Sequence, residues 1–193
     1  MNLRLFVAIE PPDLVRRRLA ALQTELKRAS GAADVRWVAV ENVHLTLQFL
    51  GAVPEERVPA VKEAVAAAAE RTRPLHLELH GTGGFPSARR ARVVWAGVAG
   101  DVAPLAELVA ELGRRLAPLG FTPEERAFSP HLTLGRARDP RGAAGLAAAL
   151  AQAASAPPAP WRASEIVLFQ SHLSPKGPRY EALARTPFGG AAV

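Results

Sequence analysis

The tetrapeptide His44-Leu45-Thr46-Leu47 occurs a second time in this chain, as His131-Leu132-Thr133-Leu134. In a β-strand successive side chains point to opposite faces, so each copy would place its His and Thr on one face and its two Leu on the other. The leucines would anchor the strand in a core and leave the His and Thr side chains accessible on the other face. If the two strands lie side by side, two imidazoles and two hydroxyl groups meet in one cleft.

Such a cleft suits the breaking of a phosphodiester bond. One group must take a proton from water and another must protonate the leaving oxygen, while neutral donors hold the phosphoryl oxygens. Histidine can do either, since its unperturbed pKa is about 6.5, and threonine is a stiff hydroxyl donor. A single His-x-Thr is commonly just a solvated strand face. The repetition, in a chain with only 5 histidines, predicts that His44 and His131 form a catalytic pair.

The composition bounds the class of protein. The 193 residues are 49% hydrophobic and 22% charged, which is typical of a globular chain with a real core. No apolar run approaches the roughly 20 residues of a membrane span, and Glu10 and Pro11 come too early for a signal peptide. We expect a soluble cytoplasmic protein. The absence of cysteine excludes disulfides, zinc–thiolate sites and thiol nucleophiles.

The chain is positively charged, and arginine carries nearly all of its positive charge. The chain has 24 basic and 18 acidic residues, a formal charge of +6, and the only lysines are Lys27, Lys62 and Lys176. Guanidinium groups match phosphate geometry and stack on bases, which is compatible with a nucleic-acid partner. An arginine-rich composition is equally compatible with genome base composition or a hot habitat.

Hydrophobic periodicity predicts helices alternating with strands. Helices are expected after Asp13, from Pro54, after a cap at Asp101 and over 143–154, and Gly81–Gly84 is expected to be a flexible turn. Strands are expected over residues 3–9, 35–40, 43–50, 75–80, 93–98, 128–135, 165–170 and 180–185. This order predicts an α+β fold, a single bilobal domain over 1–193. Its two pseudo-symmetric lobes would each be an antiparallel sheet flanked by helices, with the cleft between them.

Two further patterns lie on these strands. His76, Glu78 and His80 share one face and could ligate a metal, but solvated strand faces commonly look like this, so no metal site is predicted. Arg136 lies five residues after His131. Period-2 alternation places it on the face opposite His131 and Thr133, unless the strand bends.

The chain resembles the 2H phosphoesterase superfamily and, within it, the bacterial and archaeal RNA 2′,3′-cyclic phosphodiesterases, also called 2′-5′ RNA ligases. Paired His-x-Thr-x motifs define the superfamily, and the surrounding segments point to this branch. Nearly the whole chain takes part, through Arg4–Ile9, Trp37, Asn42–Gly51, Gly84–Pro86, Arg92–Trp95, Phe128–Arg136, Ser171, Leu173, Gly177–Pro178 and Tyr180.

The resemblance implies hydrolysis of a 2′,3′-cyclic phosphate at an RNA 3′ end to a 2′-phosphate, without metal or other cofactor. It implies that His44 gives a proton to the departing O3′ and that His131 activates water, although the identical motifs leave these roles exchangeable. Thr46 and Thr133 would hold the phosphoryl oxygens. Run backwards with an RNA 5′-hydroxyl, the same chemistry would form a 2′-5′ bond. Further substrate contacts are implied for Arg136, Ser171 and Tyr180, and RNA phosphates are expected near Arg89, Arg90 and Arg92.

Two alternatives stay open. The same chemistry could act on a small cyclic nucleotide or a 2′-5′ oligonucleotide. A non-catalytic module could instead grip an RNA end, although binding alone has no need of two proton-transfer groups. A monomer without an obligate protein partner is the default expectation.

Overall fold

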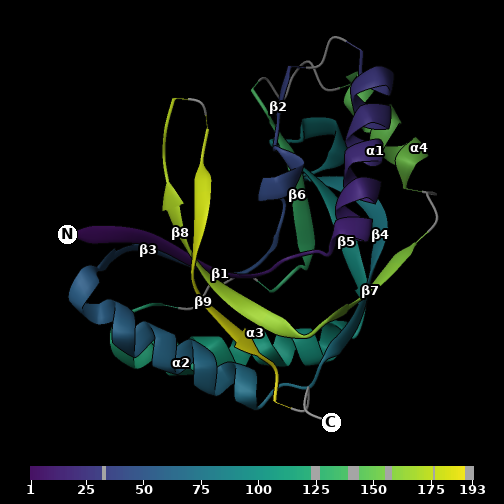
Figure 1. Ribbon diagram of the computed structural model, residues 1–193. Helices are drawn as coiled ribbons and strands as arrows, with labels where there is room; N and C mark the ends of the chain where they lie inside the picture. The colour runs from purple at the N-terminus through teal and green to yellow at the C-terminus, as the bar shows by residue number, and fades with distance from the viewer. Residues whose placement is uncertain (32–33, 123–126, 139–143, 155–157, 176, 190–193) are drawn as a thin grey trace.

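The computed structural model describes the chain except residues 32–33, 123–126, 139–143, 155–157, 176 and 190–193 (Figure 1). Its helices are α1 (Asp13–Ala29), α2 (Val58–Glu70), α3 (Val102–Leu116) and α4 (Ala144–Ala153). Its strands are β1 (Asn2–Ile9), β2 (Val35–Trp37), β3 (Leu45–Pro54), β4 (Leu75–Phe85), β5 (Val93–Gly100), β6 (His131–Ala137), β7 (Ala159–Ala163), β8 (Glu165–His172) and β9 (Arg179–Pro187). Among the described residues, no helix has the length and apolar character needed to cross a bilayer.

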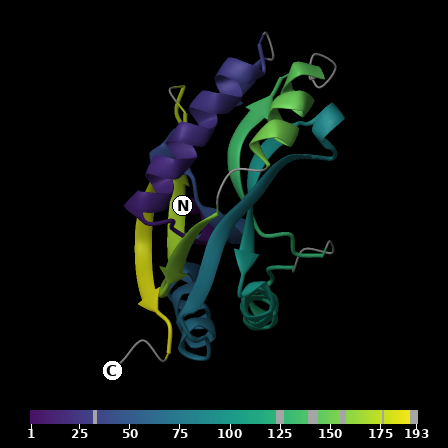
Figure 2. The same cartoon turned by 90° about the vertical axis from the view of Figure 1, so that its right-hand side faces the viewer.

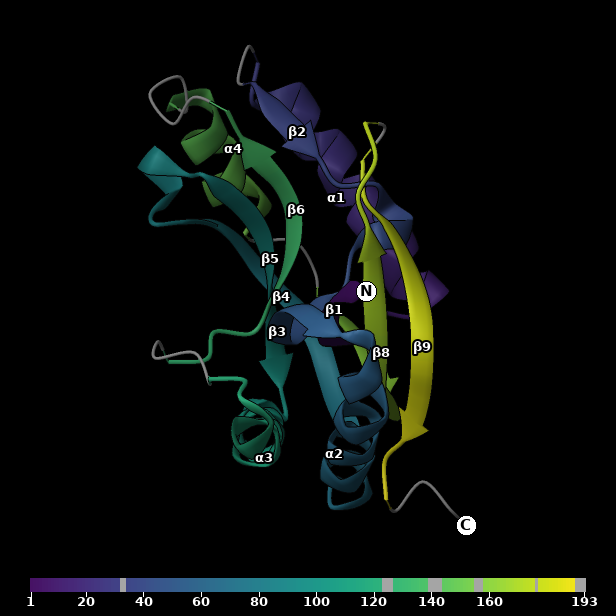
Figure 3. The same ribbon diagram turned by 90° about the vertical axis from the view of Figure 1, so that its left-hand side faces the viewer.

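All strands join one antiparallel sheet in the order β7-β4-β5-β6-β3-β1-β8-β9, with β2 pairing on β6. The two motif strands, β3 and β6, are the central neighbours, and the pairing recorded between them is the single pair Leu45 and Leu132. In this order four strands lie on either side of the junction, and β2 adds a fifth on the side of β6. The predicted α+β fold of two similar lobes is confirmed, and the two lobes are halves of one curled sheet (Figure 3).

The helices form two pairs, one on each half of the sheet. Helices α1 and α4 contact one another and pack on β7 and β4, whereas α2 and α3 contact one another and pack on β8, β9 and β3 (Figures 1 and 2). Helix α1 follows β1 yet covers the opposite half, and α3 follows β5 and does the same. This exchange of helices ties the two halves together across the junction.

The helices form where the apolar stripes predict them. In α1, the side chains of Val15, Leu19, Leu22 and Leu26 are at most 5% exposed, as expected for a stripe of helical period facing a core. Asp101 is the N-cap residue of α3, as predicted, but its side chain does not cap the helix. The carboxylate makes no cap hydrogen bond in α3 and instead accepts one from the backbone N–H of His76, at 2.8 Å.

The prediction of a turn at Gly81–Gly84 is also wrong, because these residues continue β4 against β5. Glycine is needed there for close approach rather than for a turn. A Cβ at Gly83 would overlap the indole of Trp95, and a Cβ at Gly97 would overlap the backbone carbonyl of His80.

We therefore expect Gly97→Ala to lower the free energy of unfolding by about 1–3 kcal/mol, the usual cost of overpacking. The atom in the way belongs to the backbone of β4, at the irregularity between Leu79 and Thr82, and a backbone carbonyl cannot swing aside as a flexible side chain would. Chemical denaturation at constant pH measures the effect. An unchanged midpoint would show that β4 shifts freely relative to β5.

Candidate active site

The two motifs meet at the centre of the sheet. Leu45 and Leu132 are paired and almost fully buried, at 1% and 0% exposure, and each directly follows its motif histidine. An antiparallel register through this pair places His44 opposite Thr133 and His131 opposite Thr46. The two motif strands therefore lie side by side, as a shared site requires. Strand β3 begins at Leu45 rather than Val43, so His44 sits just before it.

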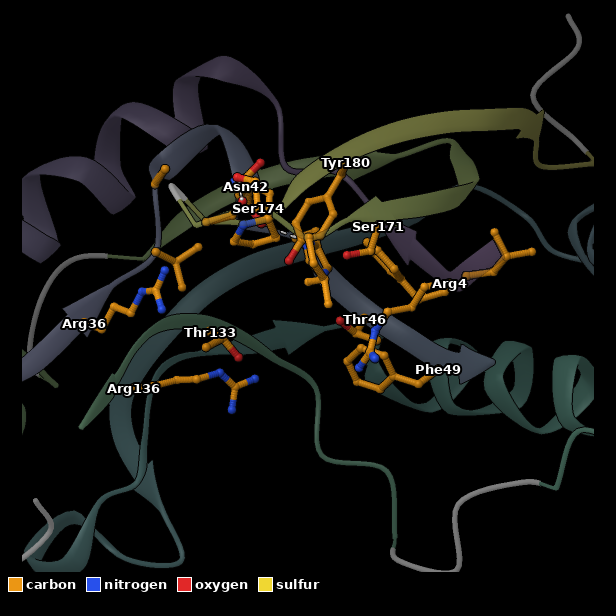
Figure 4. A pocket seen from close by; sticks show the side chains of 18 of the residues that line it. Arg4, Arg36, Asn42, Thr46, Phe49, Thr133, Arg136, Ser171, Ser174 and Tyr180 are labelled. Atoms are coloured by element: carbon orange, nitrogen blue, oxygen red, sulfur yellow. Dashed lines mark hydrogen bonds between the residues drawn. The ribbon is translucent and has the colours of Figure 1, made fainter. Parts of the chain in front are cut away.

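A cleft of about 620 Å³ opens beside this junction (Figure 4). The predicted site residues that line it are His44, Thr46, Thr133, Arg136, Ser171 and Tyr180. His131 is not among the described lining residues. It lies two residues before Thr133 on β6, and its ring and that of Phe85 form a T-shaped contact with 4.9 Å between their centroids.

Each motif histidine is oriented by the same local hydrogen bond. The Nδ1 atom of His44 lies 2.8 Å from the carbonyl oxygen of Asn42, and Nδ1 of His131 lies 2.7 Å from that of Ser129. A carbonyl can only accept, so Nδ1 carries a hydrogen in both rings. Each Nε2 is therefore the atom that can take or give a proton.

The surroundings of His44 are aromatic. Its ring stacks on Phe6, with 4.7 Å between centroids, and forms a T-shaped contact with Tyr180 at 5.2 Å. Burial lowers the pKa of His44 to about 4, against the opposing effects of the hydrogen bond to Asn42 and the charge of Glu10. In the free protein the imidazole is neutral at pH 7. Phe6 and Phe85 were not predicted to contact the histidines, because aromatic residues in apolar strands usually indicate only a core.

A β-bulge turns Arg136 into the cleft. Thr133 pairs with Trp95, but Gly135 pairs with the next residue, Val94, so Leu134 is an extra residue in β6. The bulge shifts the alternation by one and brings Arg136 to the face of Thr133. A regular strand would have placed Arg136 on the face opposite Thr133. That prediction is wrong, because the strand has an irregularity of the kind that was named as the exception.

The first motif carries the matching bulge. Thr46 pairs with Ala8 and Gln48 with Val7, so Leu47 is the extra residue in β3. This brings Phe49 to the face of Thr46, where it lines the cleft and is 61% exposed. The fourth residue of each motif is therefore a bulge, and Phe49 and Arg136 occupy equivalent positions in the two halves.

Buried Gln23 of α1 supports the second bulge. Its Nε2 donates to the carbonyl oxygens of Val38, at 2.8 Å, and of Leu134, at 2.9 Å. The backbone N–H of Val38 also donates to the Leu134 carbonyl, at 2.9 Å. These bonds satisfy the backbone groups that a bulge would otherwise leave unpaired.

Strands β8 and β9 form the wall beside His44. Ser171 and Tyr180 are paired across these strands, and both line the cleft. Burial raises the pKa of Tyr180, although nearby Arg136 and Arg4 act against the shift, so its hydroxyl stays a donor at neutral pH. The side chain of Asn42 donates to the Pro178 carbonyl at 2.9 Å, which joins this wall to the backbone that orients His44.

The arginines that line the cleft differ in part from those predicted to contact the substrate. Arg4 and Arg36 line the cleft and were not predicted, since nothing in their local sequence separates them from surface charge. Arg89, Arg90 and Arg92 are exposed and are not among the described lining residues, while the backbone carbonyl of Arg92 accepts a hydrogen bond from Ala137, next to Arg136. Their expected contact with RNA phosphates stays a prediction. Within the described part of the chain, no group of three or more His, Asp or Glu side chains is placed to hold a metal ion.

The chain also matches known proteins. A family model described as LigT like Phosphoesterase matches residues 9–95 and 98–180. The chain belongs to the LigT-like phosphoesterase family.

Relatives and solved structures of LigT-like phosphoesterases match over nearly their whole length. An RNA 2′,3′-cyclic phosphodiesterase of Methanothermobacter thermautotrophicus is 34% identical over 93% of this chain and 96% of its own. A protein of the same name from Archaeoglobus fulgidus is 35% identical over 94% of this chain and 98% of its own. The crystal structure of TT0787 from Thermus thermophilus superposes with a TM-score of 0.78 at 29% identity, covering 97% of this chain and 99% of that one. The structure of E. coli LigT complexed with 3′-AMP gives a TM-score of 0.75 at 28% identity, over 97% and 99%.

Proposed function

We propose that this phosphoesterase hydrolyses the 2′,3′-cyclic phosphate at an RNA 3′ end and leaves a 2′-phosphate. The observation that carries the proposal is the meeting of two identical motifs at Leu45 and Leu132, with both histidines held so that Nε2 is the proton-exchanging atom. The relatives named RNA 2′,3′-cyclic phosphodiesterase support the choice of substrate.

The reaction needs two proton transfers. Water oxygen bonds to phosphorus and gives its proton to one imidazole, while the bond from phosphorus to O3′ breaks and O3′ takes a proton from the other imidazole. The hydroxyl groups of Thr46 and Thr133 donate to the phosphoryl oxygens, with Tyr180 and Ser171 as further donors on the β8–β9 wall. Both proton roles are filled by side chains, so the proposed reaction runs without a metal ion.

Two arguments bear on which histidine donates the proton, and they point in opposite directions. The family resemblance makes His44 the proton donor and His131 the acceptor. The lowered pKa of His44 favours its neutral form, which is ready to accept a proton rather than to give one. A bound cyclic phosphate, being an anion, raises the pKa of a nearby imidazole and works toward the donor role.

Phe49 offers a face on which a nucleobase can stack. It is exposed within the cleft beside Arg4, at the end opposite Arg36 and Arg136 (Figure 4). We expect Phe49→Ala to raise KM for a cyclic-ended RNA about tenfold, since base stacking on an aromatic ring is worth roughly 1–3 kcal/mol. Steady-state kinetics measure it, with Leu14→Ala as a control, because Leu14 is similarly exposed, at 64%, but does not line the cleft. Equal KM values in the two variants would remove Phe49 from the substrate site.

A short RNA with a 2′,3′-cyclic phosphate end tests the function directly. The RNA is incubated with the protein in excess EDTA, and the end group is identified by mass spectrometry and by phosphatase sensitivity. A 2′-phosphate confirms the proposal and its choice of bond. A cyclic end that stays unchanged while RNA binds would favour the non-catalytic module, and turnover of small cyclic nucleotides alone would favour the smaller substrate.

The reverse reaction uses the same groups. An RNA 5′-hydroxyl in place of water would attack the cyclic phosphate and form a 2′-5′ bond. Incubating a cyclic-ended RNA with a 5′-hydroxyl RNA, and looking for a joined product, tests this reaction separately.

A further inference from the structure

The second motif strand changes its neighbour just after Thr133. On the side that faces away from β5, β6 pairs with β3 at Leu132 and with β2 at residues 135–137. Thr133 and Leu134 lie between these two pairings, and Leu134 is also the extra residue of the bulge against β5. The backbone that carries the Thr133 side chain into the cleft therefore needs contacts from outside the ladder to hold it (Figure 4).

Gln23 of α1 supplies such contacts. Its side chain is 5% exposed, and its Nε2 atom donates to the carbonyl oxygens of Val38 and Leu134, at 2.8 and 2.9 Å. A carbonyl oxygen can only accept, so the amide nitrogen faces both partners and both of its hydrogens are used. The N–H of Val38 also donates to the Leu134 carbonyl, at 2.9 Å. One side chain thus ties the bulge of the second motif to the segment that leads from β2 into the first motif.

The place of Gln23 in its helix shows what the amide is for. The other buried residues of α1 are Val15, Leu19, Leu22 and Leu26, so Gln23 is the one polar member of an apolar face. An apolar side chain would serve the core there, because burying an amide is costly unless it is hydrogen-bonded. The amide therefore serves the two carbonyl oxygens that it binds.

Strand β2 packs on the same stretch of backbone from another direction. A Cβ at Gly135 would lie 2.7 Å from Cγ1 of Val35 and 3.2 Å from the indole of Trp37. The residue after the bulge is therefore held tightly by β2, while the bulge itself is held by Gln23. Together these contacts fix the path of β6 directly after Thr133.

We propose that Gln23 is a positioning residue, which holds Thr133 where its hydroxyl group can donate to the phosphoryl group. The inference rests on the proposed function and adds to it a residue that is not among those lining the cleft. Threonine is stiff at χ1, so the position of its hydroxyl oxygen follows that of its backbone. A bulge that loses its support displaces this oxygen, and a misplacement of about 1 Å can lower a rate roughly 100-fold.

The test is a pair of double-mutant cycles on a cyclic-ended RNA. Gln23→Met keeps an unbranched side chain of similar length but removes both donors. We expect it to lower kcat about 10–100-fold while KM changes less than about threefold. In a Thr133→Val background the same substitution is expected to cost less than about threefold, because the hydroxyl group through which it acts is gone. In a Thr46→Val background the full loss remains, since Thr46 is the equivalent residue of the other motif and Gln23 bonds to Val38 and Leu134.

A general loss of stability needs its own control. Leu22→Ala removes a buried side chain of the same helix that takes no part in these hydrogen bonds, so it lowers the melting temperature without releasing the bulge. Assayed well below its melting temperature, this variant is expected to keep the kcat of the wild-type protein. If Gln23→Met does not fold, Gln23→Asn repeats the cycles, because it keeps an amide but is one methylene shorter and is expected to lose at least one of the two bonds.

The outcomes separate the two proposals. A wild-type kcat for Gln23→Met, or an equal loss in all three backgrounds, would overturn the positioning role while leaving the proposed hydrolysis intact. If the wild-type protein does not hydrolyse the RNA, the proposed function fails. The same cycles are then measured on the Kd of inorganic phosphate. Non-additive effects of Gln23→Met and Thr133→Val would support the positioning role, and additive effects, or no binding by the wild-type protein, would overturn it.

Discussion

His44→Ala and His131→Ala are each expected to reduce turnover of a cyclic-ended RNA by about 10²–10⁴-fold, the usual contribution of a positioned acid or base. Each substitution removes the only Nε2 in its motif, and no water bound in its place could match the orientation fixed by the hydrogen bonds to Asn42 and Ser129. Single-turnover kinetics with saturating protein isolate the chemical step. His80→Ala is the matched control, because His80 is exposed on β4 and does not line the cleft.

The fold must be checked beside the activity. His44 stacks on Phe6, so its truncation leaves a gap in an aromatic cluster, and His44→Gln is a second variant that fills more of this space without a titrating ring. Thermal unfolding by circular dichroism separates lost chemistry from lost structure. Two folded variants that both keep turnover would rule out the two-histidine mechanism.

The pH dependence of kcat/KM will decide which histidine gives the proton. The pKa of His44 in the free protein is about 4. As the proton acceptor, His44 is in its active form at pH 7, and its own contribution to kcat/KM falls only when the pH drops below about 4. As the donor, its active form is scarce at pH 7, and kcat/KM rises about tenfold for each unit of pH lowered toward 4. The slope between pH 7 and pH 5 distinguishes the two assignments, and the same series with His44→Gln shows whether it belongs to His44.

The same pKa makes a separate prediction for stability. An unfolded histidine titrates near 6.5 and folded His44 near 4, so between these values the unfolded chain binds more protons. The free energy of unfolding therefore falls as the pH is lowered from 6.5 to 4, by up to about 3 kcal/mol from this group. Denaturation of wild type and His44→Gln across this range isolates the contribution, and parallel curves would show that His44 is not desolvated.

The residue patterns in the sequence predicted the central junction of the sheet and the helices that cover it. The repeated His-x-Thr motif predicted that two strands meet, and Leu45 and Leu132 are indeed the pair that joins the two halves of the sheet. Apolar stripes predicted the helices, because burial of one helix face depends on spacing within a single segment. Thr46, Thr133 and His44 reach the predicted cleft, and so do Ser171 and Tyr180, which only the family resemblance had implied.

Tertiary structure alone decided the phase of the strands and the charges in the cleft. Alternation within one strand cannot reveal a bulge, because a bulge is a mismatch in pairing between two strands. The bulges at Leu47 and Leu134 therefore brought Phe49 and Arg136 into the cleft against the simple pattern. Burial of His44 by Phe6 and the pairing of Arg36 with Arg136 join segments distant in the chain. Desolvation and charge effects depend on such neighbours in space, which no local stretch of sequence contains.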